Sequence, residues 1–112
     1  MGKDLVLGLC EGRHEIPGVD EYIFPKDFFS GSGMFDFDRM HSRIHEVLYD
    51  SSSVRLYVTG YTPALVEVIN YCVADLIPLK LMHFNRETNS YIEQHVLSNY
   101  WVGELMDGGI VS

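Results

Sequence analysis

The sequence predicts an α/β domain built on a mainly parallel sheet. Short apolar runs of strand length alternate with longer segments of helical period, which is typical of parallel sheets whose strands are joined by helices. A chain of 112 residues, of which 46% are apolar, is long enough for one layered core and too short for two. We therefore expect a single domain over residues 1–112.

The chain is expected to begin with a buried strand and a short edge strand. Residues 4–10 (DLVLGLC) form an apolar run that ends at a loop over residues 11–18, which predicts a buried strand. Residues 21–25 (EYIFP) predict a short extended piece, because Pro25 either stops a strand or restricts it to a sheet edge. The glycines and serines of residues 26–33 predict a loop.

The middle of the chain predicts a helix followed by the clearest strand. Residues 34–50 have helical period, and Asp36 or Ser32 is the expected N-cap. Residues 54–59 (VRLYVT) are rich in β-branched and apolar side chains, which predicts a strand. The apolar stripe of the helix consists of Phe37, Met40, Ile44, Val47 and Leu48.

A second helix is expected directly after this strand. Thr62 is the predicted N-cap, and Pro63 suits the first helical position, where its missing N–H costs nothing. The helix is expected to end before Pro78, because the residue before a proline disfavours helical geometry. The predicted apolar face of this helix consists of Leu65, Val66, Ile69, Cys72, Val73 and Leu76.

The last third of the chain predicts a strand and a hairpin. Residues 78–85 predict the third main strand, residues 86–90 a turn, and residues 91–97 an antiparallel partner at the sheet edge. Residues 98–112 are too apolar for a free tail, so we expect them to pack on the domain or on a second subunit. Together these elements predict a small Rossmann-like three-layer domain with a C-terminal antiparallel hairpin strand.

The composition narrows the classes of partner. A net charge of −8 argues against binding duplex nucleic acid, which requires a basic stripe, but not against binding a small anion. No apolar run approaches the roughly 18 residues of a membrane span, and residues 1–10 predict a strand rather than a signal peptide. We therefore expect a cytoplasmic protein without a membrane partner, in which Cys10 and Cys72 are buried thiols rather than a disulfide.

Polar side chains follow the three main strands where each one ends. In open α/β sheets, ligands bind beyond the carboxyl ends of the parallel strands. The turn over residues 59–62 also offers two hydroxyls and the N–H groups of a helix N-terminus, which suit an anion. Plain turns at Gly12 and Gly60 are the alternative interpretation. The candidate ligand-binding residues are Gly12, Arg13, His14, Thr59, Gly60, Tyr61, Thr62, Asn85 and Arg86.

The histidines raise two further hypotheses. His41 and His45 lie one helical turn apart, a spacing that can present two ligands to a metal, but a solvated helix face is the preferred interpretation. We expect neither a metal nor another cofactor. His83 and His95 are candidate neighbours across the hairpin, either as a satisfied pair or with His83 in the crevice beside His14.

Three stretches carry a resemblance to known proteins. GRHEIPGVDEYIFP, LYVTGYTPALVEVINYC and LKLMHFNRETNSYIEQHV together resemble a group of small bacterial and phage proteins, over most of residues 10–96. The strand, Thr/Gly turn and helix are also similar to CARF domains and small ring nucleases of CRISPR systems, Rossmann-like dimers that bind cyclic oligoadenylate at the strand ends. The resemblance implies that residues 59–62 face such a ligand and that Arg13, His14 and Arg86 are pocket partners.

Two functional hypotheses follow. In the first, the chain forms a homo-oligomer such as a dimer and binds a small nucleotide or another phosphate-bearing signal, for example a cyclic nucleotide of antiviral defence. It either sequesters this ligand or cleaves it without a metal, with a ribose 2′-hydroxyl as nucleophile and with His14 and Arg13 as catalytic residues. In the second, the chain is a protein-interaction module without a small-molecule ligand, which uses its acidic surface and the Tyr-Trp-Val segment of residues 100–102.

Overall fold

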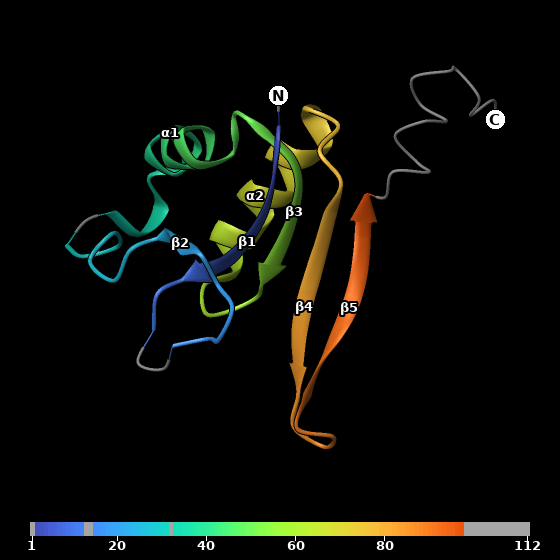
Figure 1. The fold of residues 1–112 in the computed structure, drawn as a ribbon. Helices are drawn as coiled ribbons and strands as arrows, with labels where there is room; N and C mark the ends of the chain where they lie inside the picture. Colours follow the sequence, from blue (N-terminus) through green and yellow to red (C-terminus); the bar gives the residue numbers. More distant parts are fainter. Residues whose placement is uncertain (1, 13–14, 32, 98–112) are drawn as a thin grey trace, which may run out of the picture.

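The structure, a computed structural model, describes residues 2–12, 15–31 and 33–97. These residues form a five-stranded sheet with two α-helices packed against it (Figure 1). The predicted α/β class with a mainly parallel sheet is therefore confirmed. The expectation for residues 98–112 lies outside the described residues, as do Arg13 and His14.

The strands of the sheet follow the order β2-β1-β3-β4-β5. β2 pairs in parallel with β1, β1 with β3, and β3 with β4, whereas β5 runs antiparallel to β4. The predicted short edge strand and C-terminal hairpin are both confirmed. The strand bounds are β1 (Lys3–Cys10), β2 (Glu21–Phe24), β3 (Ser51–Tyr57), β4 (Leu79–Asn85) and β5 (Ser90–Leu97).

Strand β3 begins three residues earlier than its apolar pattern predicts. Ser51 already pairs with β1, and the Ser53 hydroxyl donates a hydrogen bond of 2.7 Å to the Asp4 carboxylate. Serine is not among the residues that favour strands, so the pattern does not reveal this start. The strand ends at Tyr57 rather than at Thr59.

Helix α1 (Phe37–Leu48) follows a 3-10 turn at Gly33–Phe35. Its N-cap is Asp36, one of the two predicted residues, because the Asp36 carboxylate accepts a hydrogen bond of 3.1 Å from the Arg39 N–H. Phe37 was expected on the buried stripe, but the first turn leaves it exposed. The buried side chains of the stripe are Met40, Ile44 and Leu48.

Helix α2 (Thr62–Ala74) has Tyr61, not Thr62, at its N-cap, and Tyr61 makes no side-chain cap hydrogen bond. The prediction that Val66 and Val73 face the core is wrong, because their side chains are 47% and 46% exposed. Most positions of this helix are apolar, so periodicity does not single out one face. The side chains that pack inward are Ala64, Val68, Tyr71 and Cys72.

Two expectations from composition can be compared with the fold. Cys10 is half-buried at the end of β1 and Cys72 is buried in α2, and both are free thiols, as predicted. Among the residues that the structure describes, no helix has both the length and the hydrophobicity needed to cross a membrane.

Both helices cover the same face of the sheet. α1 and α2 lie next to each other against the sheet (Figure 1). Their buried side chains join those of the strands in one core. The expected third layer is absent from the described residues, because the connection from β1 to β2 contains no helix there. A right-handed crossover with a helix would have covered the opposite face. The strand residues of the core include Leu7, Leu9, Val54, Leu56, Leu79 and Leu81.

The opposite face, called the open face below, carries no helix from the described parts of the chain. Near β2 it is covered by Tyr22, whose ring packs against Gly8 and whose hydroxyl accepts a hydrogen bond of 3.1 Å from the Ile16 N–H. The strand registers place the following side chains on the open face: Asp4, Val6, Arg55, Tyr57, Lys80, Met82, Phe84, Tyr91, Glu93 and His95.

Candidate functional site

The strand order creates a topological switch point between β1 and β3. From the end of β1 the chain turns toward β2 on one side, whereas from the end of β3 it turns through α2 toward β4 on the other. The two connections diverge, and open α/β sheets bind their ligands in the crevice at such a point. Of the predicted ligand-binding residues, the structure brings Gly12, Thr59, Gly60, Tyr61 and Thr62 to these two connections.

Thr59 links the two strands at the switch point. Its hydroxyl donates a hydrogen bond of 2.7 Å to the Cys10 carbonyl and accepts one of 3.1 Å from the Cys10 N–H. These two bonds extend the pairing of β1 and β3 beyond the last backbone pair. Because the hydroxyl proton is already donated to Cys10, Thr59 shapes the crevice and is not placed to donate to a ligand.

Gly60 and the N-terminus of α2 form the surface that an anion would meet. Gly60 is exposed and has a φ of 77°, a conformation that glycine adopts easily. α2 begins without a side-chain cap, and Pro63 has no N–H, so the backbone amides of Thr62 and Ala64 are the donors of its first turn. A helix of 13 residues also directs the positive end of its dipole here.

Aromatic side chains line one side of this surface. The Tyr61 ring packs against Phe29, with ring centroids 4.9 Å apart, and lies 6.2 Å from the Phe35 ring. The Tyr61 hydroxyl donates a hydrogen bond to the Met34 carbonyl. Phe35 is 66% exposed, so its ring is accessible beside the start of α2. Sequence reasoning missed Phe35, because one phenylalanine after a Gly/Ser-rich loop gives no periodic signal.

Asn85 and Arg86 lie away from the switch point. The last residue of β3, Tyr57, pairs with Met82, and β4 continues for three further residues to Asn85. At about 3.3 Å per residue, Asn85 lies roughly 10 Å beyond the end of β3. Arg86 follows in the exposed turn of the β4–β5 hairpin, which projects beyond the other strands (Figure 1). The structure therefore does not bring Arg86 next to Thr59.

An anion at the switch point would meet backbone N–H groups rather than charged side chains of the described residues. Burial raises the pKa of the Cys10 thiol, although a hydrogen bond with the Tyr61 backbone lowers it in part, so the thiol is neutral at pH 7. The Glu11 carboxylate accepts a hydrogen bond of 3.0 Å from a backbone N–H of the loop after β2. The cationic candidates closest in sequence, Arg13 and His14, lie outside the described residues.

The remaining histidines make other contacts. His95 lies opposite Lys80 in the hairpin, three positions along β4 from His83, so the expected pairing of the two histidines is wrong. His45 forms a hydrogen bond of 2.8 Å between its Nδ1 and the Tyr71 hydroxyl. In the part of the chain that the structure describes, no three His, Cys, Asp or Glu side chains are grouped so that they could hold a metal ion.

Comparisons with known proteins assign no family. No protein family, curated protein or solved structure matches this chain. What the switch point binds must therefore be inferred from its own residues.

Proposed function

We propose that the chain binds a small nucleotide through its phosphate at the switch point between β1 and β3. The observation that carries this proposal is the N-terminus of α2, which has no side-chain cap and lies beside the exposed Gly60 where two connections diverge. Helix N-termini in this setting bind phosphate through backbone N–H groups and the helix dipole. A phosphate can bind despite the net charge of −8, because fixed backbone amides make the contacts and no basic surface is needed.

Phe35 supports a nucleotide rather than a bare phosphate. Its exposed ring lies 6.2 Å from the ring of Tyr61, the N-cap residue of α2. Stacking of a base on an aromatic side chain contributes about 1–3 kcal/mol and tolerates any base. A ligand that carries both a base and a phosphate, such as a cyclic oligoadenylate of antiviral defence, suits this combination.

Sequestration is the proposed activity, rather than cleavage. The Thr59 hydroxyl donates to the Cys10 carbonyl, and burial raises the pKa of the Cys10 thiol, so neither group is placed as a general base. Metal-independent cleavage of a phosphodiester, as in ring nucleases, would depend on Arg13 or His14. A homo-oligomer is compatible with the site but is not needed to build it.

A thermal unfolding assay tests the proposal. The full chain is melted with inorganic phosphate, AMP, ATP, a cyclic dinucleotide and cyclic oligoadenylate. A ligand that binds only the folded state at 100 times its Kd adds about 2.7 kcal/mol to stability, so Tm should rise with at least one nucleotide. No rise with any of them would contradict the proposal. Chromatography of the same mixtures separates sequestration, which leaves the nucleotide intact, from cleavage.

Two substitutions test the phosphate and base positions separately. Thr62→Ala removes the hydroxyl beside the amides and should weaken nucleotide and phosphate binding alike, by up to about tenfold. Phe35→Ala should weaken nucleotide binding by roughly tenfold and leave phosphate binding unchanged. Thr88→Ala and Phe84→Ala are matched controls at exposed hairpin positions. Equal losses in the controls would place the site elsewhere.

A protein-interaction module is the second candidate, because β5 offers a free edge. Among the described residues, β5 pairs only with β4, which leaves an edge of eight residues that carries the exposed Ile92. Such an edge can receive a strand from another chain. This candidate is favoured if no nucleotide changes Tm while Ile92→Lys reduces the size of the assembly measured by sedimentation.

A further inference from the structure

A cavity of about 550 Å³ lies on the open face, at the amino-terminal ends of the parallel strands. Its position is given by Asp4 near the start of β1, Ser53 in β3 and Pro78 just before β4. The switch point lies at the opposite, carboxyl ends of these strands, so the two sites are separate. Leu97, the last residue of β5, also lines the cavity.

Five of the ten side chains on the open face are apolar or aromatic. Val6 lines the cavity, and Met82, farther along the face, is only 8% exposed. Tyr91 packs edge-on against Tyr57 and Phe84, with ring centroids 4.7 Å and 5.3 Å apart. Parallel sheets are normally covered on both faces, whereas α1 and α2 cover one. A further layer is therefore expected over this face.

The charges on the open face largely cancel one another. Glu93 lies 3.5 Å from Arg55 and 3.9 Å from Lys80, and His95 Nε2 is 3.7 Å from the same carboxylate. With Asp4, two cations and two carboxylates balance, so this region is near neutral on a chain of net charge −8. This region therefore adds little repulsion of its own to an acidic segment.

Residues 98–112 have the length, position and composition of this cover. They follow Leu97 directly, so the chain continues from the rim of the cavity. Fifteen residues span up to about 50 Å when extended, whereas a strand of seven residues such as β3 is about 23 Å long. Tethering also gives a segment a local concentration in the millimolar range. The segment contains Tyr100, Trp101, Val102, Leu105 and Met106, together with Glu104 and Asp107 and no basic residue.

We propose that residues 98–112 fold back over the open face of their own chain and place apolar side chains, Trp101 among them, in this cavity. The segment then supplies the layer that the connection between β1 and β2 does not. This interaction is independent of the proposed nucleotide site, because the two lie at opposite ends of the strands.

Trp101 provides the readout, because it is the single tryptophan of the chain. The emission of the native full chain should be blue-shifted relative to the urea-denatured chain, and acrylamide should quench it severalfold less. Native and denatured values that coincide would overturn the proposal. Sedimentation at several protein concentrations shows whether the open face is covered by residues 98–112 of the same chain or by those of a second copy. Protection of Trp101 in the monomer supports folding back, whereas protection that appears only with dimer formation assigns a second copy and overturns it.

Substitutions on the open face test where the segment binds. Val6→Asp places a charge in the cavity and Lys80→Glu reverses a charge at its rim, so both should red-shift Trp101 emission and increase quenching severalfold. Val66→Asp and Lys26→Glu, at exposed positions away from the open face, are matched controls that should change neither. If Val6→Asp does not fold, Lys80→Glu decides alone. Unchanged emission in Lys80→Glu, or equal changes in the controls, would overturn the assignment.

Discussion

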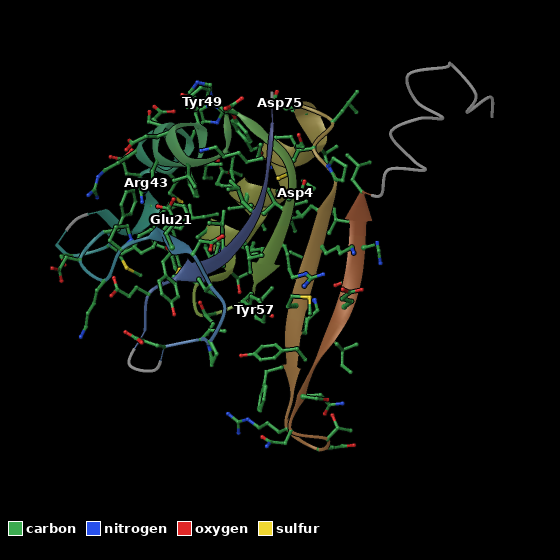
Figure 2. All side chains as sticks on the ribbon, viewed as in Figure 1. Asp4, Glu21, Arg43, Tyr49, Tyr57 and Asp75 are labelled. Carbon is green, nitrogen blue, oxygen red and sulfur yellow. The ribbon has the colours of Figure 1, made fainter. Side chains whose placement is uncertain are left out.

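Arg43 joins the edge strand β2 to helix α1. Its Nε donates a hydrogen bond of 2.6 Å to the Ile23 carbonyl. Its guanidinium lies 3.2 Å from Glu46 and 3.6 Å from Glu21, which is labelled beside it in Figure 2. β2 has four residues and pairs with β1, so few backbone bonds hold it. The planar fork of arginine lets one side chain reach a carbonyl and two carboxylates together.

Arg43→Met should therefore lower the free energy of unfolding by about 1–3 kcal/mol, because it leaves the Ile23 carbonyl without its charged donor. Arg43→Lys should recover part of the loss, since lysine lacks the fork. Urea denaturation should show a lower midpoint with an unchanged m value. Arg86→Ala, in the exposed hairpin turn, is the control and should leave the midpoint unchanged. Equal midpoints for Arg43→Met and the wild type would contradict this role.

Burial of Cys72 should make stability depend on pH in the alkaline range. Burial in α2, assisted by the negative charge of Asp75, raises the pKa of the Cys72 thiol from 9.0 to about 12. Above the lower value the unfolded chain loses the thiol proton while the folded chain keeps it. Above pH 9.0, the free energy of unfolding should therefore fall by up to about 1.4 kcal/mol per pH unit. Below pH 9.0, this thiol does not make the free energy of unfolding depend on pH. Urea denaturation across this range should show a shallower slope for Cys72→Ala; equal slopes would contradict the assignment.

At the scale of elements, the described part of the connection between β1 and β2 contains no helix. The Tyr22 ring covers this end of the open face instead, packed against Gly8. A Cβ added at Gly8 would overlap Cδ1 and Cε1 of the Tyr22 ring. The ring would have to move, and its hydrogen bond from the Ile16 N–H would be lost. The contact therefore requires glycine at this point of the strand.

Gly8→Ala should destabilise the fold by about 1–3 kcal/mol, measured by thermal or urea unfolding. In a Tyr22→Ala background the same change should cost much less, because the ring that it would meet is gone. A double-mutant cycle measures this coupling directly. If the two losses in the free energy of unfolding are fully additive, Gly8 and Tyr22 are not in contact.

Sequence patterns predict an element well where the propensities of its residues agree with the capping and turn residues at its ends. Asp36 caps α1 as predicted, and Pro63 lies in the first turn of α2. The early start of β3 at Ser51 has no apolar signal, because pairing with β1 rather than propensity fixes it. The prediction that Val66 and Val73 are buried is wrong, because most positions of α2 are apolar and packing decides which of them face the core.

At the scale of the molecule, the sequence places polar residues at strand ends but does not predict which ends meet. Thr59 and Cys10 are 49 positions apart and meet because β1 and β3 are neighbours. The polar residues that follow the three main strands predict Arg86 beside them, but β4 extends past β3 into its hairpin. The absence of a helix between β1 and β2 likewise turns the expected three layers into two among the described residues.

Phosphate binding at the switch point is tested most directly by the backbone amide NMR spectrum of the isotopically labelled full chain. It is titrated with cyclic oligoadenylate and, separately, with AMP. We predict that the largest shift changes occur at the amides of Gly60, Tyr61, Thr62 and Ala64, with smaller changes at Phe35. Changes centred on the hairpin turn or on the open face, or no change at saturating nucleotide, would contradict the account.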